Sequence, residues 1–379
     1  RTDDMPYASF NFGSQEDGNG VESVEATDAT TLVIKLRAAS TPFLANIAMC
    51  MSSPIVAPSA FDTAMENPVG TGQYKFVSWT KNSNIVLKRN EDYWNSEKAG
   101  KTENIIFTFI AEAASRVTAL NNGEADIIDG IDEAVVDTVE QGGSKIYKAD
   151  GMNINYMAFN TESEIFKNKD ARKAFAKAVN VQELVDSLYN GYASVANSVM
   201  PTWMAPYDED VKQTEYDPEA AKSELAALGI TSVKCITYSN PRPYNGKGGQ
   251  VLAEAIQGYL KEAGVDVTID TYDWTTYKTK IQTESYDICF YGWNGDNGDP
   301  DNFMNLLSDP SLSINKGLVT PSGSDRDAIY LQCEQMVAEE QPWLLISHSQ
   351  NILGYSPKVS GFYFHPTAVA FLYDAVKEA

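Results

Sequence analysis

Histidine and cysteine are scarce in this sequence of 379 residues, and their scarcity narrows the chemistry that the chain can carry. The two histidines, His348 and His365, fall on separate elements near the carboxyl terminus. No Gly-x-Ser-x-Gly, His-Glu-x-x-His or Cys–His pattern is present, and the four cysteines form no Cys-x-x-Cys pair. We therefore expect no catalytic residue, no cofactor and no structural metal.

Three of the cysteines have apolar neighbours in the sequence. Cys235 and Cys289 stand in strand-like runs, and Cys333 lies on the apolar stripe of a helix. Free cysteine is among the most buried residue types, so we expect buried thiols. Cys235 and Cys289 could be neighbours in one sheet, but the sequence alone leaves a disulfide between them open.

Basic residues are also few. The 29 Lys and Arg against 52 Asp and Glu give a net charge of −23, and phosphate binding needs basic patches, so nucleic acid is not an expected partner. No apolar run approaches the ~18–20 residues that a membrane helix needs. Residues 1–4 lack the apolar core of a signal peptide. The composition, 43% hydrophobic, predicts a globular protein with a sizeable core and two or three domains.

The most informative stretch runs from Ile288 to Phe303. It begins as a short apolar strand and then turns polar, with several Asp, Asn and Gly residues and one Pro, which is turn chemistry. Ligands of open α/β sheets sit at the carboxyl ends of strands. Trp293 there offers an apolar wall, and Asp296 offers a fixed negative charge. The acid spacing fits a calcium loop poorly, and an acidic turn that faces water is the other interpretation.

Strand and helix patterns alternate over residues 233–291, which predicts a βαβαβ run and a parallel sheet. The strand over residues 233–238 ends in a polar loop that contains Arg242, and the strand over residues 286–291 ends in the loop of Asp296. Because parallel strands end at one edge, both charged side chains are expected to leave the same edge of the sheet.

The two charges on these loops suit a zwitterion. A ligand with an amine at one end and a carboxylate at the other needs an acid and a base held apart. Asp296 supplies the acid, and the guanidinium of Arg242 can give a carboxylate two parallel hydrogen bonds. The prolines on both sides of Arg242 stiffen its loop. A salt bridge between the two residues, or two solvated charges, is the alternative.

Patterns elsewhere set the expected framework. Residues 74–79 and 85–88 are expected to form a hairpin, and residues 170–188 one long amphipathic helix with a small break near Asn180. Asp217 has the signature of an N-cap ahead of a further helix.

Several motifs resemble one family. The run Gly-Trp-x-Gly-Asp-Asn-Gly-Asp-Pro-Asp-Asn-Phe up to Phe303 is similar to the signature loop of the extracytoplasmic solute-binding proteins of peptide ABC transporters (family 5), and is closest to the dipeptide-binding branch. The same family has motifs similar to Pro-Val-Gly-Thr-Gly at residues 68–72, Arg-Asn-x-x-Tyr-Trp at 89–94 and Leu-x-x-Gly-Glu-x-Asp at 120–126.

The resemblance implies an α/β fold of the two-lobed, periplasmic-binding-protein-like type II, with mixed sheets and a hinge. The domains expected from it are a remnant of a small accessory domain (1–66), the first part of the large lobe (67–150), the second lobe (151–350) and the carboxyl-terminal part of the large lobe (351–379). The family's usual amino-terminal part is expected to be missing from this sequence.

The resemblance also implies roles for single residues. In the dipeptide branch, the Asp of Trp-x-x-Asp holds the ligand's α-ammonium group, and the Arg of Arg-Pro-Tyr-Asn binds its terminal carboxylate. These positions are Asp296 and Arg242 here. The further ligand contacts that we expect are Trp293 as a wall, Asn294 and Gly295 through backbone groups in the manner of an added strand, and Tyr244 as a weaker contact.

The function implied by the resemblance is capture of short peptides, dipeptides above all, and their delivery to an ABC permease in the membrane. The protein would be a monomer, not an enzyme, and would act in the periplasm or at the cell surface as a lipid-anchored lipoprotein. Other solutes stay open: a longer peptide, a glycan fragment or a metal chelate. A surface receptor or adhesin, and a hydrolase on a similar scaffold, are the alternatives from other classes.

Overall fold

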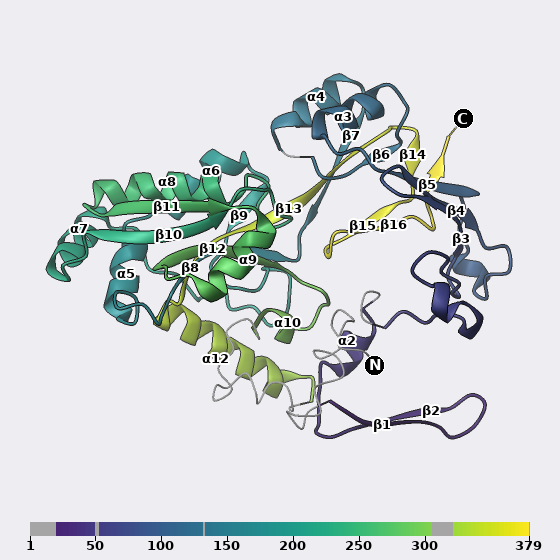
Figure 1. The fold of residues 1–379 in the computed structure, drawn as a ribbon, viewed down its shortest axis with the longest axis horizontal. Helices are drawn as coiled ribbons and strands as arrows, with labels where there is room; N and C mark the ends of the chain where they lie inside the picture. The colour runs from purple at the N-terminus through teal and green to yellow at the C-terminus, as the bar shows by residue number, and fades with distance from the viewer. Residues whose placement is uncertain (1–19, 50–52, 132, 305–320, 379) are drawn as a thin grey trace. The chain divides into compact units, whose positions relative to one another are not determined.

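The computed structural model describes residues 20–49, 53–131, 133–304 and 321–378, and the chain divides into two compact units (Figure 1). Unit 1 comprises residues 1–53 and 152–349, and unit 2 comprises residues 54–151 and 350–379. The accessory domain expected over residues 1–66 stays a prediction. Cys50 lies outside the described residues.

Unit 1 is built on a mixed sheet in which β10 and β12 are central neighbours. β10 runs parallel to β11 and β12, whereas β8 runs antiparallel to β12 and to β13. The predicted parallel βαβαβ run is therefore confirmed. The strands are β8 (Asn153–Phe159), β9 (Ala193–Val195), β10 (Ser232–Tyr238), β11 (Asp266–Tyr272), β12 (Ile288–Asn294) and β13 (Trp343–Tyr355).

Helices cover this sheet, and α8 packs against β10 and β11 (Figure 1). The helices of the unit are α2 (Phe43–Ile47), α5 (Lys169–Lys177), α6 (Val181–Tyr189), α7 (Pro218–Ala227), α8 (Gly249–Glu262), α9 (Trp274–Thr283), α10 (Asp301–Met304) and α12 (Ser324–Glu340). A hairpin of β1 (Val21–Ala26) and β2 (Leu32–Leu36) also belongs to it.

The sequence predicted one helix over residues 170–188 with a small break near Asn180; the break is confirmed, but the single helix is wrong. Two helices, α5 and α6, share that range, because the side chain of Asn180 accepts a hydrogen bond from the backbone N–H of Glu183 and starts a new helix. The other predicted cap is confirmed, since Asp217 accepts from the N–H of Ala220 at the start of α7.

The core of unit 1 lies on both faces of its sheet. Phe159, Phe166 and Phe175 pack with tilted and edge-to-face rings. A second cluster gathers Met, aromatic and aliphatic side chains around α12: Met152, Ile154, Tyr156, Met200, Met204, Phe303, Met304, Tyr330, Trp343 and Leu345 are among its members. Cys235, Cys289 and Cys333 are buried free thiols, as predicted.

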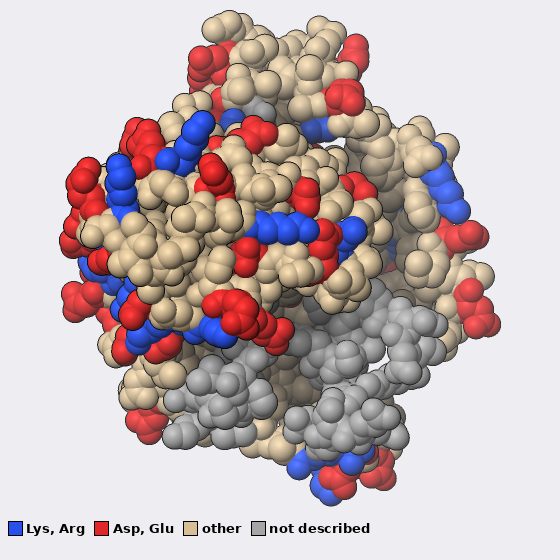
Figure 2. Space-filling view, turned by 60° about the vertical axis from the view of Figure 1, so that its left-hand side comes forward, with Lys and Arg blue, Asp and Glu red and all other residues tan. Residues whose placement is uncertain are grey.

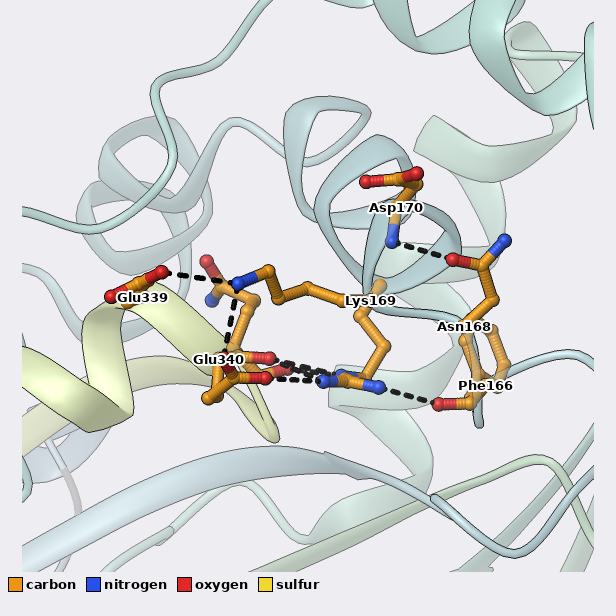
Figure 3. A network of polar contacts seen from close by, with 8 residues as sticks. Phe166, Asn168, Lys169, Asp170, Glu339 and Glu340 are labelled. Carbon is orange, nitrogen blue, oxygen red and sulfur yellow. Dashed lines mark hydrogen bonds and ion pairs between the residues drawn. The ribbon is translucent and has the colours of Figure 1, made fainter.

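The carboxyl end of α12 is tied to the start of α5 (Figure 3). Arg172, which is 6% exposed, donates to the backbone oxygens of Glu340 and Phe166 at 2.6–3.0 Å and 2.8 Å. Arg172 thereby satisfies a carbonyl that the helix end leaves without an intrahelical partner. Lys169 adds ion pairs to Glu339 and Glu340 at 3.2 Å and 3.0 Å. These contacts fix α12, which reaches the candidate site at its other end.

Unit 2 contains an antiparallel sheet of β3 (Tyr74–Thr80), β4 (Asn84–Arg89) and β5 (Asn104–Thr108), so the predicted hairpin is confirmed. A small core lies between α3, α4 and the strands beside them. The remaining elements are η1 (Pro58–Thr63), η2 (Ser96–Lys98), α3 (Ala113–Asn121), β6 (Ile127–Ile128), η3 (Glu133–Val135), α4 (Val136–Gln141), β7 (Lys145–Asp150), the end of β13, β14 (Val359–Ser360), β15 (Tyr363–His365), β16 (Val369–Phe371) and β17 (Val376–Lys377).

Acidic and basic side chains are interspersed over the face that Figure 2 shows, with no large field of one sign. In the part of the chain that the structure describes, no helix has the length and apolar character to cross a membrane.

Candidate ligand-binding site

The strand that leads into the site is longer than the sequence suggests. β12 continues to Asn294, which pairs with Asn153 of β8, whereas the prediction ended the strand at Tyr291. The polar sequence hid this, because pairing with a buried neighbour overrides the low strand propensity of Gly and Asn. Trp293 and Asn294 are therefore strand residues, both half-buried.

Asp296 stands just past this strand and is held by one asparagine. Its backbone N–H donates to Oδ1 of Asn302 at 2.8 Å, and its Oδ2 accepts from Nδ2 of Asn302 at 3.3 Å. The same Oδ1 accepts from the indole Nε1–H of Trp293 at 3.0 Å. Asn302, which is 1% exposed, thus joins the predicted acid to the predicted wall. Sequence reasoning missed Asn302, although it stands in the Asp-Pro-Asp-Asn turn.

Asp299 braces the same loop. Its carboxylate accepts from the backbone N–H of Asp301 at 2.9 Å, a role in turns that is common for aspartate. It also pairs with Arg326 of α12 at 2.7 Å and 3.1 Å, and both side chains are nearly buried. Two parallel hydrogen bonds fix the orientation of both groups. α12 therefore positions the loop that carries Asp296.

Asp301 is the buried carboxyl of this loop, at 4% exposure. Burial raises its pKa to about 6, the neighbouring charge of Asp299 adds to the rise, and Arg326 opposes it. Its Oδ1 has no hydrogen-bond partner among the residues described. Asp301 thus loses its proton with difficulty, unlike an ordinary surface aspartate.

Arg242 is held differently, by an aromatic ring. Its guanidinium carbon lies 4.0 Å from the ring centroid of Trp274, the first residue of α9, which is within cation–π range. The loop itself closes through two backbone hydrogen bonds between Arg242 and Asn245, at 2.9 Å and 2.8 Å. Within the described ranges no carboxylate forms an ion pair with Arg242, and its buried Nε lacks a hydrogen-bond partner there. Trp274 is a second residue that sequence reasoning missed.

Arg242 and Trp293 lie toward the same face of the sheet. The ring of Trp274 is 5.4 Å from the ring of Tyr291, and residues 291 and 293 share a face because side chains alternate along a strand. Burial raises the pKa of Tyr291, and the positive charge of Arg242 partly offsets that rise, which agrees with their closeness. The predicted common sheet edge is confirmed, since β10 and β12 are parallel neighbours.

Tyr244 is a packing residue in this structure. Its side chain is 4% exposed and covers Gly292, where an added Cβ would come within 2.3 Å of the ring. Next to it, Asn245 accepts from the hydroxyl of Tyr189 at 3.0 Å and donates to that of Tyr238 at 3.2 Å. These buried hydrogen bonds fix the loop that carries Arg242.

After Cys289, one edge of β12 has no ladder partner among the residues that the structure describes. Pairing with β10 involves only Ile288 and Cys289 of β12, whereas pairing with β8 continues to Asn294. The stretch after Cys289 could therefore pair with an extended ligand. The N–H of Gly295 already donates to the backbone oxygen of Met152 at 2.6 Å, so a ligand contact at Gly295 would use its carbonyl.

His348 of β13 lies against the backbone of β8. His348 is buried, and its Nδ1 lies 2.6 Å from the backbone oxygen of Asn153. Burial lowers the pKa of His348. Among the described residues, no group of three or more His, Cys, Asp or Glu side chains is arranged to hold a metal ion.

Comparison with known proteins identifies the family of this chain. Residues 2–313 match the model of the family described as "Bacterial extracellular solute-binding proteins, family 5 Middle". The match covers more than half of the chain, and the protein belongs to this family of solute-binding proteins.

The names of individual relatives indicate different ligands. The chain is 28% identical to heme-binding protein A of Haemophilus influenzae, over 94% of this chain and 69% of that protein. It is 29% identical to the dipeptide-binding protein of Pseudomonas aeruginosa, over 91% of this chain and 70% of the relative.

A solved structure is similar over nearly the whole chain. The periplasmic binding protein DppA of Helicobacter pylori, in complex with the peptide STSA, is 25% identical with a TM-score of 0.78, over 95% of this chain and 74% of that one. The predicted periplasmic-binding-protein fold and the family resemblance are thus confirmed.

Proposed function

We propose that this protein captures short peptides, with dipeptides as the preferred ligands, and delivers them to the permease of an ABC importer. Its family and the dipeptide-binding proteins among its relatives support this role. The observation that carries the ligand class is Arg242. Its guanidinium lies over the Trp274 ring and has no ion-pair partner in the described part of the chain. Arg242 follows β10, and the parallel neighbour of β10, β12, leads to Asp296.

In this proposal the two charged residues bind the two ends of the ligand. Asp296 accepts hydrogen bonds from the α-ammonium group, and Arg242 donates to the terminal carboxylate. Trp293 forms the apolar wall beside the ligand. Asn294 and the carbonyl of Gly295 pair with its backbone along the open edge of β12. Tyr244, which is buried, contributes through the packing of the Arg242 loop rather than through a large contact.

We further propose that the protein works outside the cytoplasm as a monomer, in the periplasm or as a lipid-anchored protein at the cell surface. It acts by binding and not by catalysis, and it needs no cofactor. Incubation with a dipeptide for many hours would then leave the peptide intact. Hydrolysis that copurifies with the protein and survives removal of contaminants would favour the hydrolase alternative.

A thermal-unfolding screen of the full chain tests the ligand class. The ligands are dipeptides, tetrapeptides and longer peptides, glycan fragments, metal chelates and hemin. A ligand at ~100 times its dissociation constant stabilises the folded state by about 2.7 kcal/mol. We expect the largest shift with dipeptides that have both termini free. If no dipeptide shifts the transition while another class does, the assignment to dipeptides is wrong.

A further inference from the structure

The side chain of Asn302 makes three hydrogen bonds to the two residues proposed to meet the amine end of the ligand. Its Oδ1 accepts from the indole of Trp293 at 3.0 Å and from the backbone of Asp296 at 2.8 Å. Its Nδ2 donates to the Asp296 carboxylate at 3.3 Å. One amide group therefore fixes the ring of Trp293, the backbone at Asp296 and one carboxylate oxygen together.

A buried asparagine in a turn commonly serves the turn itself, by bonding nearby backbone groups. Asn302 departs from that pattern, because two of its three bonds go to the side chains of Trp293 and Asp296. The turn is closed by other groups. The N–H of Asn302 donates to the backbone oxygen of Asp299, and the N–H of Asp299 donates to Oδ1 of Asn297. The Asn302 side chain is thus committed to the site.

Asn302 is itself held rigidly. It is 1% exposed, and it follows Asp299, whose carboxylate is fixed by Arg326 of α12. A group held in this way can orient a neighbour without paying a large ordering cost when a ligand arrives.

We propose that Asn302 is a positioning residue that orients the Asp296 carboxylate and the Trp293 indole, and so sets the preference for ligands with a free α-ammonium group. This inference rests on the proposed function. Asn302 acts through its two neighbours, and the ligand contacts are theirs.

The test compares two ligands of the full chain by calorimetry: alanyl-alanine and N-acetyl-alanyl-alanine. Asn302→Leu removes all three hydrogen bonds with little change in volume. We expect about ten-fold weaker binding of alanyl-alanine and less than about two-fold change for the acetylated ligand. When Asp296→Asn is already present, Asn302→Leu should weaken the binding of alanyl-alanine by less than about a further two-fold, because the group that Asn302 orients has lost its charge.

Asn155→Leu is the matched control. Asn155 is also fully buried, and it donates to the hydroxyl of Tyr189, which in turn donates to Asn245 in the Arg242 loop, at the end of the site proposed to bind the carboxylate that both ligands share. Its loss should change the binding of both ligands by the same factor. A ligand-free measurement adds a second readout: the indole N–H of Trp293, assigned by Trp293→Phe, should exchange with solvent at least about ten-fold faster in Asn302→Leu.

The outcomes separate the two proposals. If the unmodified chain binds alanyl-alanine but Asn302→Leu weakens both ligands equally, or adds its full effect to Asp296→Asn, Asn302 is only structural. Unchanged exchange of the Trp293 indole would overturn the inference as well. If the unmodified chain binds neither ligand, the proposed function fails, and the role of Asn302 in ligand preference fails with it.

Discussion

The two charged ends of the candidate site are held by different physical means. Asp296 is held by hydrogen bonds with Asn302, one donated and one accepted by Asp296, within a loop that is anchored to α12 through Asp299 and Arg326. Arg242 is held by the face of Trp274, in a loop closed by its own backbone. An anion needs donors around it, whereas a cation can rest on a ring and keep its donors for a ligand. The acidic end is thus defined by a polar network, and the basic end by an aromatic surface.

The largest effects are expected from substitutions that remove one of the two charged groups at a time. Arg242→Ala should weaken free dipeptides by about 2–5 kcal/mol, since it removes the partner of a buried carboxylate, and should change peptide amides much less. Asp296→Asn should weaken the binding of free dipeptides far more than the binding of N-acetylated dipeptides. Calorimetry measures both effects, with free and amidated dipeptides for Arg242→Ala and with free and N-acetylated dipeptides for Asp296→Asn. Equal losses for all pairs would mean that the ends do not act separately.

Removal of the buried Asp301 carboxyl should change how the free energy of unfolding depends on pH. The pKa of Asp301 is raised to about 6 from its ordinary 3.8, so between these values the folded protein keeps a proton that the unfolded chain has released. The free energy of unfolding therefore falls as pH rises from ~4 to ~6. Asp301→Asn abolishes this titration. The free energy of unfolding of this variant, minus that of the unmodified chain, should therefore be ~1–3 kcal/mol larger above pH 6 than at pH 4.

Denaturant unfolding at several pH values measures the Asp301 effect. Asp62→Asn, which changes an exposed aspartate of unit 2, is the control and should leave the pH profile unchanged. A constant stability difference between Asp301→Asn and the unmodified chain from pH 4 to pH 7 would contradict the prediction.

Loss of the aromatic support should be milder. Trp274→Leu keeps an apolar side chain but removes the ring under Arg242, and cation–π contacts contribute about 0.5–2 kcal/mol. Free dipeptides should bind more weakly by that amount, while peptide amides change less. Trp94→Leu, at a tryptophan that is 77% exposed in unit 2, controls for loss of an indole. Equal losses for acid and amide ligands would show that Trp274 does not support Arg242 specifically.

The smallest effect is expected at the far end of α12. The Lys169 pairs with Glu339 and Glu340 are largely exposed, so Lys169→Met should cost at most about 1 kcal/mol of stability and leave ligand preference unchanged. Arg172→Met, which strips buried carbonyls of their donor, should cost clearly more in the same denaturation experiment. A larger loss at Lys169 than at Arg172 would reverse this order.

The sequence predicted which strands carry the charged residues, because strand and helix periods are strong signals over residues 233–291. It could not predict the last residues of β12. Gly292 and Asn294 have low strand propensity, and only pairing with β8 keeps them extended. The sequence indicated a small break near Asn180 but not two separate helices, since the cap formed by Asn180 competes with an apolar stripe that continues across it.

The supports of the site were harder to predict than the charges. Asn302 and Asp296 are close in sequence, yet the turn that brings them together depends on Asp299 and on Arg326, which lies on another helix. Trp274 is separated from Arg242 by the whole of α8 and β11, so no local pattern joins them. Assignments of ligand contacts carried over from the family stay predictions until binding is measured.

The contact between the Arg242 guanidinium and the Trp274 ring has a consequence for how the site responds to the salt concentration around the protein. Dissolved salt weakens attraction between exposed opposite charges, but it has little effect on a short-range contact between a cation and a ring face. Across a wide range of salinity, such as a bacterium meets when its habitat dries or floods, this side chain should keep its orientation toward an arriving ligand.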